Sequence, residues 1–338
     1  MKILVTGGLG YIGSHTVVEL YRHGHEAVII DDLSNSEVTV LPALERLTGD
    51  KIPFYQTDIL DETSLVRIFE QESPIDGIIH FAAKKSVNES MEQPLLYYEN
   101  NIKGLINLMR MVEDFRVSNL VFSSSCTVYG QPNVVPVSES TPTTKSITPY
   151  GNSKLIAEMM LDEYTRLHDG LGTVLLRYFN PVGAHESGEI GELPRGIPQN
   201  LMPFITQSAA GLRPALKVFG HDYDTRDGTA IRDYIHVVDL AEAHVKAIEW
   251  LQDHPDEVEY FNVGTGVGQT VLEVIESFER STGQKLAYEK VERRLGDIEQ
   301  IWADTTKVER VLGWKAQRSI DDMTSSAWKW EMKLRGLK

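Results

Sequence analysis

A tyrosine and a lysine four positions apart, Tyr150 and Lys154, are the residues whose types and spacing most directly suggest chemistry. On an α-helix, side chains four positions apart lie on the same face. A nearby ammonium group favours the phenolate form of tyrosine, whose reference pKa is about 10. Lowering that pKa by about three units needs about 4 kcal/mol of differential stabilisation, at about 1.36 kcal/mol per unit. The pair is therefore a candidate base near neutral pH, although the same spacing also arises by chance on a solvated helix.

The elements that would position this pair alternate along the first half of the chain. A β-branched run at 3–6 leads into a glycine-rich turn and an amphipathic segment at 14–23. Further apolar runs, separated by helical patterns, lie at 27–30, 52–55, 78–82, 120–122 and 173–176. Strands that alternate with helices are typical of a parallel sheet covered on both faces. We therefore predict an α/β fold with a Rossmann-type, doubly wound parallel sheet.

The amino-acid composition of the sequence changes after Phe179. Loops rich in glycine and proline follow, and helical periodicity returns at 235–251. We predict a nucleotide-binding domain at 1–178, with a return segment at about 235–262, and a smaller mixed C-terminal substrate domain at 179–338.

The glycines Gly7, Gly10 and Gly13 form a G-x-x-G-x-x-G loop between the first strand and the helix after it. Such glycines let the backbone turn tightly and approach a pyrophosphate at a helix N-terminus. Asp31 ends the next strand, where its carboxylate would accept hydrogen bonds from the adenosine ribose hydroxyls. That charge would repel a 2′-phosphate, and no arginine directly follows Asp31 and Asp32, so NAD is favoured over NADP. A glycine-rich turn that binds nothing is the alternative, and the strand–turn–helix context argues against it.

Three later segments extend the nucleotide-site prediction. Asp58 follows the third strand, where a carboxylate can meet the adenine amino group. The fourth strand ends at 80–85 with small residues that allow close backbone approach and a lysine that can reach phosphate. Residues 99–101 begin the second half of a long helical pattern that would run under the cofactor.

The overall composition restricts the function classes. The 338 residues carry a net charge of −16 and include no basic block, which argues against nucleic-acid binding. A single cysteine, Cys126, excludes an internal disulfide and fits a reducing compartment. We find no secretory leader at the N-terminus and no apolar run of about 20 residues, so we predict a soluble, cytoplasmic protein without a membrane span. The ten histidines include no H-E-x-x-H or comparable pairing, and no metal site is expected.

Four motifs resemble those of a known enzyme family. TGGLGYIGSH at 6–15 looks like the opening of the extended short-chain dehydrogenases/reductases. FSSSCTVYG at 122–130, RYFNPVGA at 177–184 and GTAIRDYIHV at 228–237 narrow the resemblance to the UDP-glucose 4-epimerases. The matching segments run from residue 3 past Asp304, so the resemblance covers nearly the whole chain.

The resemblance assigns roles residue by residue. It implies that Tyr150 is the base at the sugar 4-hydroxyl, that Lys154 lowers its pKa and binds the nicotinamide ribose, and that Ser125 hydrogen-bonds the same hydroxyl. The implied contacts of an NAD cofactor are Gly7, Gly10, Tyr11, Ile12, Gly13, Asp31, Asp32, Asn35, Asp58, Ile59, Phe81, Ala82, Lys85, Asn100, Ser123, Tyr150, Lys154 and Tyr178. The implied contacts of a UDP-sugar are Ser125, Tyr150, Phe179, Asn180, Asn200, Leu201, Phe219, Arg232, Arg294, Asp297 and Ile301. Two arginines on a diphosphate make physical sense, because arginine binds phosphate oxygens bidentately.

The implied reaction interconverts UDP-galactose and UDP-glucose, an isomerisation of the EC 5.1.3.2 type. C4 of the sugar is transiently oxidised by NAD⁺ to a 4-keto intermediate, which presents its other face and is reduced again. The cofactor ends as it began, so we expect it to stay bound.

Several rival functions are disfavoured by specific residues. Related sugar-nucleotide dehydratases carry an Asp-Glu pair where this chain has Cys126 and Thr127. A fucose-synthase-type enzyme uses a cysteine near this strand end, but Cys126 lies one position away from it, and burial as a small packed residue is the simpler interpretation. A non-catalytic NAD sensor is a remote alternative, since such proteins usually lose the tyrosine or the lysine.

Two properties stay open at this point. The family site at Ile301 influences whether an N-acetyl group fits, and isoleucine is intermediate in size, so a UDP-N-acetylglucosamine 4-epimerase with the same mechanism is an alternative. The resemblance also implies a homodimer through the apolar helical faces that begin at Leu95 and Leu155, and a monomer with those faces on its own core is the other possibility.

Overall fold

The computed structural model describes residues 1–294 and 296–337, and the chain forms two compact units. Unit 1 comprises Met1–Gly130, Pro142–Tyr178 and Ala241–Phe261. Unit 2 comprises Gln131–Thr141, Phe179–Leu240 and Asn262–Lys338. This division differs from the predicted one at 131–141, because the backbone of Val137 bonds Trp302 and Asp304 within unit 2. Periodicity does not reveal such a pairing between distant segments.

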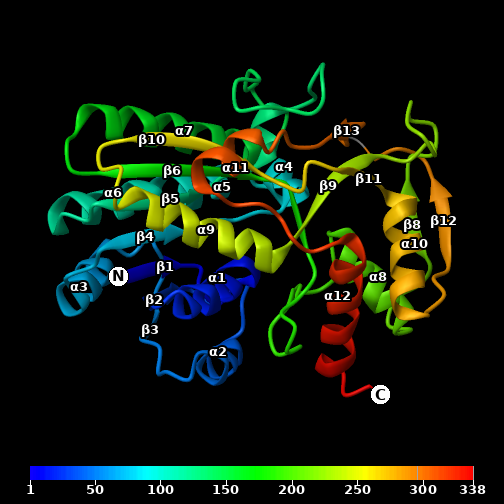
Figure 1. Ribbon diagram of the computed structural model, residues 1–338, viewed down its shortest axis with the longest axis horizontal. Helices are drawn as coiled ribbons and strands as arrows, with labels where there is room; N and C mark the ends of the chain where they lie inside the picture. Colours follow the sequence, from blue (N-terminus) through cyan, green and yellow to red (C-terminus); the bar gives the residue numbers. More distant parts are fainter. Residues whose placement is uncertain (295, 338) are drawn as a thin grey trace. The chain divides into compact units, whose positions relative to one another are not determined.

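Unit 1 is built on a seven-stranded sheet with the order β10-β6-β5-β4-β1-β2-β3, which Figure 1 shows from β10 near the top to β3 at the bottom. The strands are β1 Lys2–Thr6, β2 Glu26–Asp31, β3 Phe54–Gln56, β4 Gly77–His80, β5 Asn119–Ser123, β6 Gly172–Tyr178 and β10 Val258–Val263. The pairs among β1 to β6 are parallel. The chain builds outward from β1 on one side and from β4 on the other, so these two strands flank the switch point where open α/β sheets bind ligands. The predicted fold class is confirmed.

Helices alternate with these strands, as a doubly wound sheet requires. They are α1 Tyr11–Arg22, α2 Val40–Thr48, α3 Glu62–Glu72, α4 Val87–Glu92, α5 Pro94–Tyr98, the π-helical turn η1 Glu99–Lys103, α6 Gly104–Phe115, the 3₁₀ turn η2 Cys126–Tyr129, α7 Pro149–Leu167 and α9 Val237–Leu251. Strands β4 and β5 are buried along their whole length, which explains why their sequences read as continuous apolar runs. One core cluster joins strand residues such as Leu4, Ile78 and Leu120 with Leu105 of α6 and Leu161 of α7.

Two predicted helices differ from the observed ones. Helix α1 begins at Tyr11 rather than near Ser14, because Gly10 is the extended N-cap residue and Gly13 lies inside the helix. The long helix predicted from Leu95 is interrupted by η1. Such π-turns occur frequently at functional sites, and apolar spacing alone does not reveal them.

Unit 2 is a mixed α/β unit with two small sheets. One has the order β11-β9-β13 with β7 also paired to β9, and the other pairs β12 with β8. The strands are β7 Asn180–Val182, β8 Leu216–Phe219, β9 Ile231–His236, β11 Gly268–Thr270, β12 Tyr288–Val291 and β13 Gln300–Ile301. The helices are α8 Leu201–Ala209, α10 Val271–Thr282, α11 Thr306–Leu312 and α12 Ile320–Leu334. Its core gathers Val182, Ile205, Val218, Phe278 and Met323.

None of the helices in the described residues combines the length and apolar composition that a membrane crossing requires.

Candidate active site

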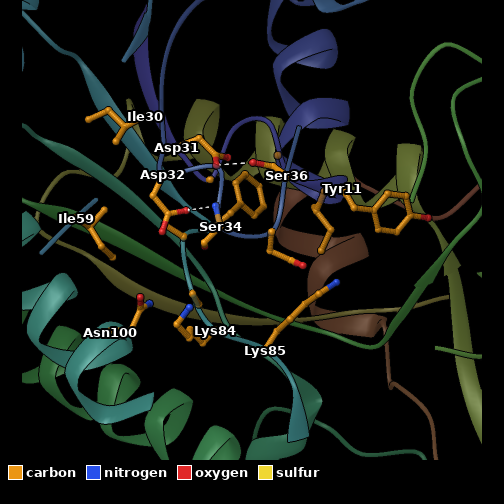
Figure 2. Close-up of a pocket in the computed structure, with 18 of the residues that line it drawn as sticks. Tyr11, Ile30, Asp31, Asp32, Ser34, Ser36, Ile59, Lys84, Lys85 and Asn100 are labelled. Atoms are coloured by element: carbon orange, nitrogen blue, oxygen red, sulfur yellow. Dashed lines mark hydrogen bonds between the residues drawn. The ribbon is translucent and has the colours of Figure 1, made fainter. Parts of the chain in front are cut away.

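A cleft of about 920 Å³, its open mouth included, lies in unit 1 beside the carboxyl ends of β1 and β4. It is lined by Gly7, Gly10, Tyr11, Ile12, Gly13, Ile30, Asp31, Asp32, Ser34, Asn35, Ser36, Thr57, Asp58, Ile59, Phe81, Ala82, Ala83, Lys84, Lys85, Asn100, Tyr150, Lys154 and Tyr178. Figure 2 shows the acidic pair Asp31 and Asp32 on one side and Lys84, Lys85 and Asn100 on the other.

The glycine loop is close-packed in a way that requires glycine. A Cβ at Gly13 would lie 2.3 Å from the carbonyl oxygen of Gly7, and a Cβ at Gly7 would lie 2.9 Å from the backbone nitrogen of Ala82. Gly7 also has a φ of +70°, which L side chains rarely adopt. The loop therefore brings bare backbone, and the first turn of α1, to the cleft.

Asp31 is buried at the end of β2 and is held by three donors. Its Oδ2 accepts from the backbone nitrogen of Leu9 at 3.0 Å, and its Oδ1 accepts from Leu33 N at 3.0 Å and Ser36 Oγ at 2.6 Å. The neighbouring Asp32 accepts from Ser34 N at 2.8 Å (Figure 2). These bonds fix the carboxylate that the sequence predicted as the ribose acceptor.

Asn101 ties the opposite wall of the cleft to helix α7. Its Oδ1 accepts from the backbone nitrogen of Lys84 at 2.9 Å, and its Nδ2 donates to the Lys84 carbonyl at 3.1 Å and to Ser153 Oγ at 3.0 Å. Ser153 Oγ in turn donates to the carbonyl of Tyr150 at 2.7 Å. The π-turn that carries Asn101 thus joins the backbone of Lys84 to the start of α7.

Tyr150 lies in the first turn of α7. Thr148 is the N-cap residue, whose side chain accepts from Gly151 N, and Pro149 occupies the first helical position. Burial raises the pKa of Tyr150, the neighbouring Tyr178 raises it further, and a hydrogen bond with Ser125 opposes both effects.

Lys154 is buried one turn further along α7. Its Nζ donates to the carbonyl oxygen of Ser123 at 2.7 Å and lies 4.7 Å from the centre of the Phe122 ring. Burial lowers the pKa of Lys154 to about 8, and the charge of Glu158 opposes that shift.

The resemblance implies that Lys154 lowers the pKa of Tyr150, whereas burial raises that pKa in the structure. Both side chains line the same cleft, but the Lys154 ammonium bonds the Ser123 carbonyl oxygen, and burial is the largest influence on the phenol. Desolvation always disfavours the charged form, and a four-residue spacing carries no information about it.

The predicted diphosphate arginines lie in unit 2, on or near its sheets. Arg232 of β9 donates to the carbonyls of Ile231 at 2.8 Å and Ile298 at 2.7 Å. Arg294 pairs with Asp297 at 2.8 Å and lies 5.5 Å from the ring centre of Phe219. Three of the predicted substrate residues, Arg294, Asp297 and Phe219, therefore lie together.

The remaining predicted substrate residues of unit 2 are placed as follows. Asn200, the N-cap residue of α8, donates through its side chain to Glu192 at 2.6 Å, and Leu201 begins the helix. Ile301 of β13 is fully buried and pairs with Arg232 across the sheet. Phe179 is buried, and Asn180 begins β7.

Most of the predicted cofactor contacts line one cleft, and Ser123 is the exception. Ser123 is buried and does not line the cleft, and its backbone carbonyl accepts a hydrogen bond from Lys154. The sequence analysis missed Ile30, Ser34 and Ser36, although serines directly after an acidic pair are a recognisable turn signal. It also missed the buried pair of Glu158 with Arg177, which nothing in the local sequence reveals. Within residues 1–294 and 296–337, no three His, Cys, Asp or Glu side chains form a group that could hold a metal ion.

Comparisons with known proteins agree with this geometry. Residues 4–327 match the model of the family described as GDP-mannose 4,6 dehydratase. A UDP-glucose 4-epimerase of Yersinia pestis is 49% identical over 333 residues, covering 98% of this chain and 98% of the relative. One from Schizosaccharomyces pombe is 47% identical over 335 residues, covering 98% of this chain and 94% of the relative.

Solved structures give the same result. A UDP-glucose 4-epimerase of Stenotrophomonas maltophila with bound NAD and formylated UDP-arabinopyranose has a TM-score of 0.97 and 48% identity, covering 99% of each chain. The Bifidobacterium longum enzyme in complex with NAD⁺ and UDP has a TM-score of 0.93 and 44% identity, covering 98% of each chain. Similarity of this extent, over both units and with the tyrosine, lysine and glycine loop in one cleft, means that the chain belongs to the UDP-glucose 4-epimerase family of extended short-chain dehydrogenases/reductases.

Proposed function

We propose that this chain is an NAD-dependent UDP-glucose 4-epimerase that interconverts UDP-galactose and UDP-glucose. The observation that carries the proposal is that Tyr150 and Lys154 line the same cleft as the glycine loop, within one compact unit. A dinucleotide site that also holds a tyrosine–lysine pair is equipped for proton transfer beside hydride transfer.

The cleft fits NAD as the proposed cofactor. The glycine loop offers backbone at the start of α1, where the helix N-terminus favours a pyrophosphate. Asp31, fixed by its three donors, offers a carboxylate to ribose hydroxyls, and Lys84 and Lys85 bring positive charge to the opposite wall. The acidic Asp31 and Asp32 would repel a 2′-phosphate, which favours NAD over NADP.

The side chains of unit 1 would perform the proton chemistry. When bound, NAD⁺ supplies the hydride acceptor for C4 and a positive charge in the cleft that favours the phenolate of Tyr150. Tyr150 then takes the proton of the sugar 4-hydroxyl, and the hydrogen bond with Ser125 orients the phenol for that transfer. The ammonium group of Lys154, which donates to the Ser123 carbonyl, adds a second positive charge one turn of α7 away from Tyr150. The proton returns from Tyr150 when C4 is reduced on its opposite face.

The residues of unit 2 would hold the UDP portion of the substrate. Arg232 and Arg294 are the proposed diphosphate ligands, because a guanidinium group can bind phosphate oxygens with two nitrogens. The proposed contacts also include Phe179, Asn180, Asn200, Leu201, Phe219, Asp297 and Ile301. Firm binding of the diphosphate with looser binding of the sugar is what a reaction on both faces of C4 requires.

The test is to incubate purified protein with UDP-galactose, without added NAD, and to quantify UDP-glucose. Product formation would support 4-epimerisation with a retained cofactor, and Tyr150→Phe should abolish it at unchanged cofactor content. The absence of product even after NAD is supplied would refute the proposal for plain hexoses. UDP-N-acetylglucosamine would then be the next substrate to test.

We extend the proposal to the assembly and the cellular setting. Leu95, Ile156, Met159 and Leu167 expose apolar side chains on α5 and α7, which suits a homodimer that buries these helices. Sedimentation should show a dimer that Met159→Glu weakens, whereas Val134→Glu, on an exposed loop, should leave it intact. An unchanged dimer in the Met159 variant would exclude this face. A cytoplasmic role in galactose metabolism completes the proposal.

A further inference from the structure

Helix α7 carries a buried carboxylate, Glu158, one turn beyond Lys154. Its side chain is 2% exposed, and its partner Arg177 on β6 is also buried, with an exposure of 5%. Arg177 Nη2 donates to Glu158 Oε2 at 2.8 Å, and Arg177 Nε donates to Oε1 at 3.0 Å. An arginine that grips a carboxylate with two nitrogens fixes the orientation of both groups.

Arg177 is itself held on several sides. Its Nη1 donates to the hydroxyl of Tyr129 at 3.1 Å, and its guanidinium lies 5.1 Å from the Tyr129 ring centre and 4.7 Å from that of Tyr260. These contacts come from the 3₁₀ turn after β5 and from β10. The ion pair therefore has little freedom to move.

Glu158 also reaches the serine cluster at the end of β5. Ser124 Oγ donates to Glu158 Oε1 at 2.5 Å. Ser124 stands between Ser123, whose carbonyl accepts from Lys154, and Ser125, whose side chain bonds Tyr150. One carboxylate thus connects α7 with the backbone that holds the lysine and presents the serine.

Within the part of the chain that the structure describes, the following charged and titratable groups lie near Lys154 or its neighbour Glu158. Glu158 and Tyr150 lie on the same helix, His80 comes from β4, and Tyr178 and Arg177 come from β6. Burial lowers the pKa of His80 to about 3, with the Lys154 charge as a second cause, so His80 is neutral in the working range. Glu158 is the group whose charge opposes the effect of burial on Lys154.

We propose that Glu158 is a positioning residue. It keeps the Lys154 ammonium charged and holds the serine segment so that the Ser123 carbonyl meets Lys154 and the Ser125 side chain meets Tyr150. The effect on catalysis rests on the proposed function, whereas the effect on Lys154 does not. The network occupies no part of the cleft wall, so it would act only through Lys154 and the serines.

A matched pair of variants separates charge from shape. Glu158→Gln keeps the size of the side chain and removes its charge, whereas Glu158→Asp keeps the charge and shortens the side chain. The pKa of Lys154 is measured directly by NMR on protein labelled with ¹³C at lysine Cε and saturated with NAD, with Lys154→Arg to assign the signal. We expect the midpoint of the Lys154 titration to fall by about one pH unit in Glu158→Gln and to stay near the wild-type value in Glu158→Asp.

The pH profile of UDP-galactose turnover provides the second measurement. If Lys154 must be charged, the alkaline limb of kcat should move to lower pH in Glu158→Gln by the same amount as the NMR midpoint. Tyr129→Phe removes the hydroxyl that Arg177 bonds without changing any charge, so it should leave the alkaline limb in place. An inactive wild-type protein would refute the proposed function while the NMR series still decided the role of Glu158.

A second variant covers the case in which Glu158→Gln fails to fold. In Glu158→Gln, Arg177 would be a buried charge that has lost its carboxylate, and removal of one partner of a buried ion pair is strongly destabilising. The double variant Glu158→Gln with Arg177→Met removes both charges and should also show a lowered Lys154 midpoint, by less than Glu158→Gln alone because the repulsion by Arg177 is lost as well. An unchanged midpoint in the variants that lack the carboxylate, or an equal drop in Glu158→Asp, would overturn the proposal.

Discussion

The two units hold their functional side chains in opposite ways. In unit 1, Tyr150, Lys154 and Ser125 are 8%, 4% and 6% exposed, and each has a partner within the unit. In unit 2, the proposed substrate residues Arg294 and Phe219 are 45% and 39% exposed. The groups proposed for chemistry are buried and fixed, whereas Arg294 and Phe219, two of those proposed for binding, are exposed and lie against each other.

This difference has a physical reason. A proton-transfer group acts best in a preorganised site of low dielectric, where its orientation needs no adjustment during the reaction. Burial of charged or titratable groups is nevertheless unfavourable, as the lowered pKa values of Lys154 and His80 show. An exposed arginine avoids that cost and can exchange a carboxylate partner for a phosphate. We therefore expect the buried groups of unit 1 to lower the free energy of unfolding, whereas the exposed arginine of unit 2 has no such cost.

The sharpest test of the comparison is Lys154→Met. Methionine is apolar and similar in size, so we expect turnover of UDP-galactose to fall by about 10³-fold. We also expect the free energy of unfolding at pH 7 to rise by about 1 kcal/mol, because a buried charge is replaced by an apolar group. Turnover and urea unfolding, each at measured cofactor content, check the two parts. If Lys154→Met lowered both turnover and the free energy of unfolding, the burial of Lys154 would not be a cost to stability, and the comparison would fail.

His80→Gln tests the burial of titratable groups in unit 1. Burial lowers the pKa of His80 from 6.5 to about 3, so between these values the unfolded chain binds more protons than the folded one. The stability contributed by the neutral imidazole is present above about pH 6.5 and is lost as the pH falls toward 3. Between pH 7 and pH 4 this loss amounts to about 3 kcal/mol. Urea unfolding at the two pH values should show a smaller acid loss, by that amount, in His80→Gln.

His168→Gln is the control for this experiment, because His168 is exposed at the end of α7. It should lose as much stability at pH 4 as the wild type. Equal acid losses in the His80 variant and the wild type would show that His80 is not held neutral by the fold.

Arg294→Ala tests the exposed binding groups of unit 2. Loss of a charge-assisted contact costs about 2 kcal/mol, so we expect the KM for UDP-galactose to rise by about 30-fold, with a much smaller change in kcat. Retained NAD and the urea midpoint should not change. Arg293→Ala is the matched control, because its guanidinium pairs with Asp222 and lies over the ring of Tyr223. An effect of Arg294→Ala mainly on kcat would contradict the proposal that this exposed residue of unit 2 acts in binding and not in the chemical step.

Thr270→Ala should have the smallest effect. Thr270 caps α10 in unit 2 through a capping box with Glu273. Removal of the cap should lower the free energy of unfolding by about 1 kcal/mol and leave kcat unchanged. Ser319→Ala, at the equivalent capping box of α12, should behave alike. A drop in kcat in either variant would mean that packing in unit 2 also controls the chemistry.

The sequence predicted much of unit 1 because the relevant signals are local. The apolar runs at β1, β2, β4 and β5 report strands buried on both faces. The glycine loop and Asp31 report a strand–turn–helix unit whose backbone only glycine can adopt. The motifs that resemble one enzyme family then supplied most of the residues that line the cleft.

The tertiary structure alone decided how those residues are held. Burial raised the pKa of Tyr150 and lowered that of Lys154, and burial depends on which distant segments pack around a side chain. The pairing of Glu158 with Arg177 and the clamp of Asn101 on Lys84 join elements that are separate in the chain. Spacing within a helix or strand fixes the face on which a side chain lies, but only long-range packing fixes its partners, its dielectric surroundings and therefore its charge.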